Sequence, residues 1–216
     1  MRSNAVALGR VKETYTTGAR RLASRSIAGL TRTHVTPNAL TTAGVSLCAL
    51  ASVLVFFEYR SEPFFWLGAV FFVAGSLLDI LDGALARAGG KTTPFGAFMD
   101  STTDRMSEAF MLGAIALVLV RDGSELGVGL TVAAIAGSFL VSYTRARAEA
   151  LGLRGDVGIG SRAERVVVIT AGLVLAPWVP LELAILVLVA TSWITVIQRV
   201  LHVRNQLRTK GETTSV

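Results

Sequence analysis

Two pairs of aspartates at helical spacing are the residues of this sequence that could most clearly do chemistry. Asp79 and Asp82 are three residues apart, and Asp100 and Asp104 are four apart. Either spacing places both side chains of a pair on one face of an α-helix. The pairs are separated by a short connection, so antiparallel neighbouring helices can bring all four carboxylates to one level.

Four ionised carboxylates in a partly dry site need positive charge beside them. Hard divalent cations supply it, and oxygen ligands without a nearby His or Cys favour Mg²⁺ or Mn²⁺ over Zn²⁺. Two such ions about 3.5–4 Å apart, bridged by carboxylates and a phosphate, form a known catalytic arrangement. We therefore predict two metal ions held by Asp79, Asp82, Asp100 and Asp104. The alternative is a structural charge network between packed helices, although carboxylates inside a membrane are usually functional.

Small residues share the helix faces of the aspartates. Gly83 and Ala86 follow the first pair on its face, and Gly96 precedes the second pair on the same stripe. Such a face lets a ligand approach the backbone closely. Arg87 stands beside it, where a guanidinium group could clamp a diphosphate.

Long apolar runs must carry these pairs. Apolar residues make up 52% of the 216-residue chain. A sixth run, 95–120, contains four charged residues, and five runs are uncharged: 39–57, 63–78, 128–144, 166–181 and 183–198. About 20 apolar residues suffice for a helix to cross a membrane. We predict an all-α polytopic membrane protein with six transmembrane helices and an N-terminal amphipathic helix at the membrane interface.

The predicted division of the chain follows these runs. Residues 1–35 form an amphipathic arm beside the membrane, 36–203 a six-helix transmembrane catalytic domain, and 204–216 a cytoplasmic tail. Thr36 and Thr93, each followed by proline, mark two helix starts, and Ser161 with Glu164 marks a third as a capping box. All three starts fall on one side, where their positive dipole ends suit a phosphate. The charged connection at about 145–162 is long, as functional segments often are.

The placement of charge predicts the orientation. Arg60 and Arg121 are the only two of the 21 Lys and Arg residues on one predicted side, which is the positive-inside pattern. Both termini and the active site are therefore predicted to face the cytoplasm, in the plasma membrane. Tyr59, Trp66 and Trp178 flank the opposite loops, as an aromatic belt would. This placement accounts for the net charge of +6 without nucleic acid as a partner.

Eight positions across 26 residues form one motif: Asp79-x2-Asp82-Gly83-x2-Ala86-Arg87-x8-Gly96-x3-Asp100-x3-Asp104. The motif resembles the signature of the CDP-alcohol phosphatidyltransferases at every signature position. The resemblance implies transfer of a phosphatidyl group from CDP-diacylglycerol to an alcohol, with release of CMP. It also implies that the four aspartates hold the metals, that Asp104 takes the proton of the alcohol, and that the protein is a homodimer among membrane lipids. The nucleotide contacts would be Asn38, Thr41, Asp82, Gly83, Ala86, Arg87 and Gly96.

Three further stretches resemble the phosphatidylinositol-phosphate synthase branch of that family: 142–149, 161–165 and Gln198-Arg199. By this likeness Arg145, Arg165 and Arg199 would hold the phosphate of inositol 1-phosphate, a phosphorylated polyol. The chain departs from some members, which have glutamate in place of Ser161 and proline in place of Ala163. We expect these two differences to change the local conformation of the loop at 161–165 more than the chemistry of the site.

Two other functions compete with this one. A phosphatidylglycerol-phosphate synthase would use glycerol 3-phosphate, which an arginine cluster would also bind. A divalent-cation transporter would line its pathway with the aspartates. A transporter would not need Arg87 beside the carboxylates, and it would tend to carry polar residues deeper in several helices.

Overall fold

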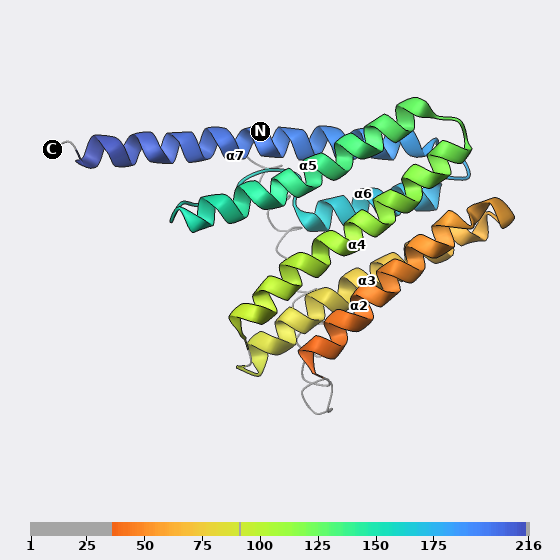
Figure 1. The fold of residues 1–216 in the computed structure, drawn as a ribbon, viewed down its shortest axis with the longest axis horizontal. Coiled ribbons are helices and arrows are strands. Elements are labelled where there is room, and N and C mark those ends of the chain that lie inside the picture. The colour runs from red at the N-terminus through yellow and green to blue at the C-terminus, as the bar shows by residue number, and fades with distance from the viewer. Residues whose placement is uncertain (1–35, 91, 215–216) are drawn as a thin grey trace, which may run out of the picture.

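The computed structural model describes residues 36–90 and 92–214. This part of the chain is entirely helical in its regular secondary structure. It forms six α-helices and one short 3₁₀ turn (Figure 1). In chain order these are α2 (Pro37–Phe56), η1 (Glu58–Arg60), α3 (Pro63–Ala88), α4 (Pro94–Arg121), α5 (Glu125–Ala150), α6 (Arg162–Leu175) and α7 (Leu181–Thr214). The all-α class is thereby confirmed for the described residues. The predicted amphipathic helix falls in residues 1–35, outside them.

The three marked helix starts lie where the sequence predicts them. The hydroxyl oxygens of Thr36 and Thr93 each accept a hydrogen bond from the backbone N–H three residues later, at 3.3 and 3.0 Å. At α6 the backbone N–H of Ser161 donates to Glu164 Oε2 at 2.6 Å, as in a capping box. These bonds satisfy backbone groups that have no partner within the helix. The starts of α2 and α4 lie together, because Thr36 and Thr93 line one pocket.

Two helices extend beyond their predicted ends, and one stops short. α5 continues past Thr144 to Ala150, so the connection to α6 spans only 151–161. Alanine, arginine and glutamate favour helix, and Arg145 Nε pairs with Glu149 Oε1 at 2.9 Å one turn later. α7 continues through 204–214, so the predicted tail is helical to Thr214. α6 ends at Leu175 because prolines follow closely in the sequence.

Four helices are long and apolar enough to cross a membrane, namely α2, α3, α5 and α7 up to Thr209. α4 is longer than most of them but carries the charged residues of the sixth run, and α6 has only 14 residues. Large apolar side chains cover the outer faces of these helices; Val70 and Leu126, for example, are 65% and 74% exposed. Such a surface suits contact with lipid.

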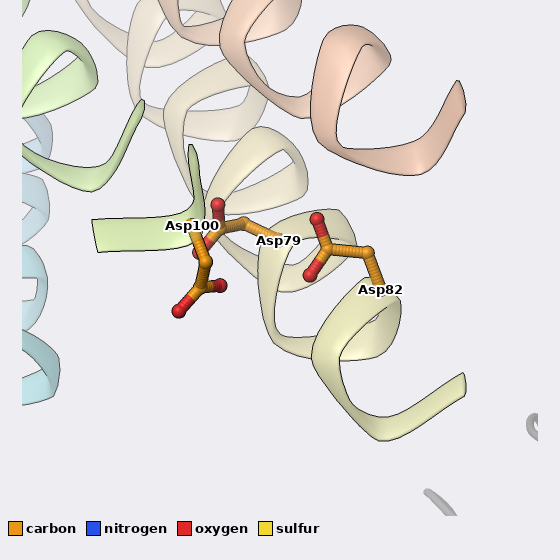
Figure 2. A group of neighbouring side chains, drawn as sticks. All are labelled: Asp79, Asp82 and Asp100. Carbon is orange, nitrogen blue, oxygen red and sulfur yellow. The ribbon is translucent and has the colours of Figure 1, made fainter. Parts of the chain in front are cut away.

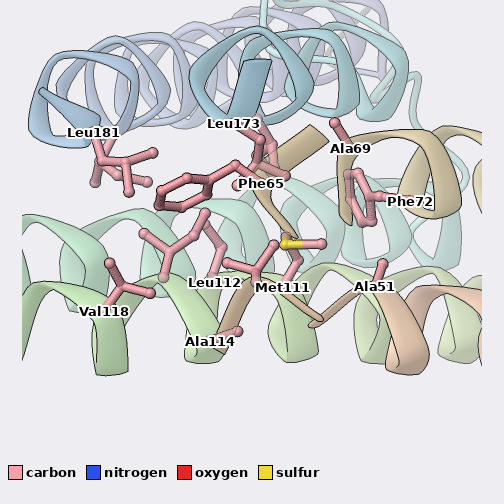
Figure 3. Packing of buried hydrophobic residues seen from close by; sticks show 14 of the residues in the cluster. Ala51, Phe65, Ala69, Phe72, Met111, Leu112, Ala114, Val118, Leu173 and Leu181 are labelled. Atoms are coloured by element: carbon pink, nitrogen blue, oxygen red, sulfur yellow. The ribbon is translucent and has the colours of Figure 1, made fainter. Parts of the chain in front are cut away.

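The hydrophobic core gathers residues from the later parts of α2, α4 and α6 and from the first parts of α3 and α7, away from the three capped helix starts. Figure 3 shows how these side chains pack. Phe72 from α3 and Met111 from α4 lie at its centre with Leu173 from α6, and all three are buried. α2 packs on α3 and α4, α5 on α4 and α7, and α6 on α3 and α7. The four aspartates of α3 and α4 thus lie towards the other end of the bundle, away from most of this core.

Polar and aromatic contacts join the turns at the core end. Arg121 Nη2 donates to Phe56 O at 2.8 Å and lies 3.5 Å from Glu58 Oε1. The rings of Trp66 and Trp178 stack with their centroids 6.0 Å apart. Two members of the predicted aromatic belt are therefore in contact, at the end of the bundle away from the aspartates.

α2 and α3 pack against each other at Gly44 and Gly75, where the two helices are too close for a side chain. A Cβ atom on Gly75 would lie 2.6 Å from both Gly44 O and Cys48 Sγ. A Cβ atom on Gly44 would lie 2.9 Å from Gly75 O and 3.5 Å from Asp79 N. The contact therefore places the carboxylate-bearing part of α3 directly against α2.

We expect Gly75→Ala to lower the free energy of unfolding by about 1–3 kcal/mol, the usual effect of overpacking, because the added methyl group meets backbone of α2. Gly113→Ala is the matched control, since a Cβ atom there meets nothing within 4 Å. That control should be neutral or stabilising, because alanine is the better helix former. Thermal unfolding in detergent measures both variants. Equal stability of the two would show that the α2–α3 contact accommodates a methyl group.

Candidate active site

Three of the four aspartates meet between α3 and α4. Asp79 and Asp82 lie one turn apart near the end of α3, and Asp100 on α4 lies beside them (Figure 2). One carboxylate oxygen from each lies within 4.8 Å of the other two. Asp79 and Asp82 are buried, and Asp100 is half-buried. The chain reverses between the helices at Gly90, whose φ of +61° suits glycine.

Asp104 lies one turn further along α4 and is joined to this group through an arginine. Arg162, the first residue of α6, places Nη1 2.7 Å from Asp104 Oδ1 and also donates it to Asp79 Oδ2. A guanidinium group thus bridges the deepest carboxylate and one of the outer three. The structure therefore brings all four aspartates into one cluster with a cationic side chain at its inner end.

The outer three carboxylates fit a hard divalent cation. Asp82 Oδ2 accepts a hydrogen bond from the Thr41 hydroxyl group, whereas its buried Oδ1 has no hydrogen-bond partner within the described protein. A buried carboxylate oxygen without a partner is unfavourable unless a ligand completes its coordination. The three donors are all carboxylate oxygens, the type that Mg²⁺ and Mn²⁺ prefer. The group is therefore suited to hold a divalent cation.

A pocket of about 390 Å³ opens beside these carboxylates, between the starts of α2 and α4 and the end of α3. All the residues expected to contact the nucleotide line it: Asn38, Thr41, Asp82, Gly83, Ala86, Arg87 and Gly96. A Cβ atom on Gly83 would approach Arg87 Nη1 to 3.3 Å, and one on Gly96 would approach Thr93 Oγ1 to 3.1 Å. Two helix N-termini and an arginine beside carboxylates suit a diphosphate group that binds together with a cation.

Arg165 is buried and paired with Glu108 of α4. Its Nε donates to Glu108 Oε1 at 2.6 Å, its Nη2 to Oε2 at 2.9 Å, and its Nη1 to Gly160 O at 2.9 Å. A two-point pair of this kind fixes the orientation of the guanidinium group. It also fixes the start of α6 against α4, one turn beyond Asp104.

Arg199 of α7 is held by the loop before α6. Its Nε donates to Val157 O at 2.8 Å, and its Nη1 donates to Val141 O on α5. The loop is itself fixed on α7, because Gly160 N donates to Thr195 Oγ1 at 2.7 Å. The side chain of Arg199 is therefore oriented by two segments, α5 and the loop before α6.

Arg145, at the end of α5, belongs to the same region. The positive charges of Arg145 and Arg165 repel the positive charge of Arg199, which places the three side chains near one another. The side chain of Arg145 is 56% exposed and pairs with Glu149. Because a guanidinium group has five N–H donors, Arg165 and Arg199 keep donors for an anion beyond the bonds described above. The structure thus gathers the three arginines that the sequence singles out, one exposed and two held by protein acceptors.

Two contacts of the site do not follow from the sequence. From the sequence, Arg162 is only one of several arginines near a helix end, whereas the structure sets it on Asp79 and Asp104. The partner of Arg165 is equally hidden. Glu108 does carry a signal, because an acidic residue within an apolar run generally requires a buried partner.

Comparison with known proteins assigns this geometry to a family. The family described as CDP-alcohol phosphatidyltransferase matches residues 34–203. The archaetidylinositol phosphate synthase of Pyrococcus horikoshii is 37% identical to the chain over 174 residues, which cover 80% of this chain and 86% of that protein.

Solved structures agree with this assignment. The phosphatidylinositol phosphate synthase of Mycobacterium tuberculosis with CDP-DAG bound matches with a TM-score of 0.73 and 31% identity, over 85% of this chain and 94% of that chain. The same enzyme in complex with manganese and citrate matches with a TM-score of 0.72 and 32% identity, over 84% and 88%. The chain therefore belongs to the CDP-alcohol phosphatidyltransferase family.

Proposed function

We propose that the chain is a phosphatidylinositol phosphate synthase, which transfers the phosphatidyl group of CDP-diacylglycerol to a hydroxyl group of inositol 1-phosphate and releases CMP. One observation carries the proposal: a carboxylate-lined pocket and a group of three arginines lie on either side of Asp104 and Arg162. The pocket suits the diphosphate of the lipid donor, and the arginines suit a phosphorylated acceptor. The names of the Pyrococcus and Mycobacterium relatives support inositol phosphate as that acceptor.

The donor nucleotide is proposed to bind between α2, α3 and α4. Room for the nucleotide next to the backbone is left by the small residues Gly83, Ala86 and Gly96. The positively charged guanidinium group of Arg87 can bind its phosphates. Asn38 and Thr41 supply polar groups from the first turns of α2. CDP-diacylglycerol bound to the Mycobacterium enzyme supports this donor.

Two ions of Mg²⁺ or Mn²⁺ are proposed to be held by Asp79, Asp82, Asp100 and Asp104. When bound, they would stabilise the charge that develops on the attacking and leaving oxygens. The manganese complex of the Mycobacterium enzyme supports a requirement for metal. The carboxylates would hold the two ions at the end of the pocket, between the donor and the acceptor.

The proposed reaction is a displacement at phosphorus. The acceptor oxygen forms a bond to the phosphorus that carries diacylglycerol, the bond from that phosphorus to the bridging oxygen breaks, and CMP leaves. The proton of the acceptor hydroxyl group passes to Asp104. Among the four carboxylates, that of Asp104 lies outside the group of three, two of which line the nucleotide pocket, and it faces Arg162 of α6. It is therefore the carboxylate best placed to face the acceptor.

Arg145, Arg165 and Arg199 are proposed to bind the acceptor phosphate. Glu108 and the loop carbonyl groups hold two of them in fixed orientations, which lowers the entropy lost when the anion binds. Arg145 is exposed and can close over the ligand from the end of α5. A phosphate held there would place the inositol ring of the acceptor beside Asp104.

The membrane arrangement is also part of the proposal. α4 is long enough to cross, at about 42 Å for its 28 residues, and α6 would cross together with the turns that follow it, which gives six spans. Basic residues gather at the end that carries the site, which favours cytoplasmic termini and a cytoplasmic active site in the plasma membrane. We propose the same division of the chain as the sequence predicts, with the arm at 1–35, the catalytic domain at 36–203 and the tail at 204–216, of which residues up to Thr214 continue α7. A homodimer is proposed from the family resemblance.

The choice of acceptor is tested by offering purified protein CDP-diacylglycerol with one of four acceptors. We expect CMP release with inositol 1-phosphate and little with inositol or serine, because the arginines require a phosphate. Chelation should abolish turnover, and Mg²⁺ or Mn²⁺ should restore it. Preference for glycerol 3-phosphate would make the chain a phosphatidylglycerol-phosphate synthase. Divalent-cation flux into liposomes without CMP release would favour a transporter.

Arg145→Gln should raise the KM for inositol 1-phosphate about tenfold, since a charge-assisted hydrogen bond to an anion contributes about 1.5–3 kcal/mol. The KM for CDP-diacylglycerol should stay nearly unchanged. Arg147→Gln is the matched control, because it removes the same charge from an exposed position on another face of α5. Arg145 is preferred to Arg165 for this test, since loss of Arg165 would leave Glu108 buried without a partner. An equal rise in both variants would show a general effect of charge.

Asp104→Asn should lower kcat by about 10²-fold or more, as expected for loss of a general base. Donor binding should persist, because the group of Asp79, Asp82 and Asp100 is intact. Turnover is measured as CMP release, and donor binding as the rise in melting temperature with CDP-diacylglycerol. Turnover within a few-fold of the wild type would exclude Asp104 as the base. Simultaneous loss of binding and turnover would assign it to metal retention instead.

A further inference from the structure

The carboxylate cluster has two unlike halves. The outer half is formed by Asp79, Asp82 and Asp100; Asp82 and Asp100 line the nucleotide pocket, and the buried Oδ1 of Asp82 has no hydrogen-bond partner among the described residues. Asp104 Oδ1 also accepts no hydrogen bond, but it has Arg162 Nη1 at 2.7 Å. The inner half, formed by Asp79 and Asp104, is filled by Arg162, whose single Nη1 atom contacts both carboxylates. Asp79 belongs to both halves.

We propose that Arg162 is an internal counter-ion that occupies the inner half of the cluster and withdraws when the second divalent cation binds there. This inference rests on the proposed two-metal function of the four aspartates. It makes the two cation positions inequivalent: the outer one is ready to accept an ion, and the inner one must first lose a guanidinium group.

Electrostatics requires this exchange. The Nη1 atom lies 2.7 Å from Asp104 Oδ1, so the oxygen that faces the arginine is one that a cation would need. The guanidinium group and a divalent cation cannot both lie against that oxygen, because the two positive groups would occupy the same space and repel strongly in a partly buried site. Without either cation, however, Asp79 and Asp104 would repel each other. Arg162 therefore stabilises the cluster before metal binds and competes with metal afterwards.

The anchoring of α6 allows the side chain to move while the helix stays in place. Arg165 ties the helix to Glu108, and Glu164 closes the first turn on Ser161 N. Arg162 itself stands at the first position of the helix, and its side chain is 24% exposed. It can leave the carboxylates by rotation about its own side-chain bonds. A substrate phosphate that enters with the cation offers the released guanidinium group a new anionic partner.

The test measures Mn²⁺ binding to purified protein in detergent, with free Mn²⁺ followed by electron paramagnetic resonance. Wild-type protein should bind one ion tightly and one weakly. In Arg162→Gln the weak site should tighten about tenfold, the factor that corresponds to removal of one charge-assisted contact, while the tight site changes little. Arg105→Gln is the matched control, because Arg105 follows Asp104 directly but donates to Ser101 O. It should leave both affinities near the wild-type values.

Thermal unfolding supplies a second measurement. Metal-free Arg162→Gln should melt below the wild type, because Asp79 and Asp104 then repel each other, and saturating Mn²⁺ should remove the difference. Arg162→Lys, which keeps the charge without the planar guanidinium group, should give an intermediate affinity at the weak site.

The outcomes separate the two proposals. If wild-type protein binds no Mn²⁺ or only one ion, the two-metal function itself fails. If it binds two ions and Arg162→Gln leaves the weak site unchanged or weakens it, the counter-ion role is overturned and the function stands. If Arg162→Gln stays unfolded even with Mn²⁺, and Arg162→Lys does not change the weak site, Arg162 is a structural residue only and the inference is overturned.

Discussion

The mutual repulsion of four carboxylates between two neighbouring helices is the constraint on which the rest of this structure depends. Asp79, Asp82 and Asp100 converge to within 4.8 Å of one another, and Asp104 follows one turn deeper. Such a cluster is stable in a partly dry site only if cations, hydrogen bonds or both offset the repulsion between its negative charges. The protein supplies the Thr41 hydroxyl group and the Arg162 guanidinium group from α2 and α6, which lie on either side of the α3–α4 pair.

The apolar half of the bundle provides the rigidity that this cluster needs. Its core joins α2, α3, α4, α6 and α7 away from the carboxylate cluster, and the glycine contact between α2 and α3 fixes their separation next to Asp79. Packed interiors do not deform continuously, so the carboxylates are held in place by residues distant from them.

Arginine side chains contribute to this site in several different environments. Arg87 lines the pocket, Arg162 bridges two carboxylates, Arg165 is locked on Glu108, and Arg199 is held by backbone carbonyl groups. In each setting the planar guanidinium group offers several donors at once, so it can satisfy protein acceptors and still face an anion. The two halves of the proposed reaction, donor binding and acceptor binding, thus meet at Asp104 and Arg162.

The family resemblance predicted seven of the residues that line the pocket. The sequence by itself determined the helical class, the three helix starts and the spacing of the aspartates. These features are local: caps, apolar runs and a motif whose two halves are joined by a short turn, so spacing along the chain predicts position in space. Only the tertiary structure decided that α5 and α7 extend beyond their apolar runs, that Glu108 holds Arg165, and that Arg162 lies on Asp79 and Asp104. The Arg162 and Arg165 contacts join residues 57 to 83 positions apart. No local periodicity encodes such pairs, because they arise from how the helices pack.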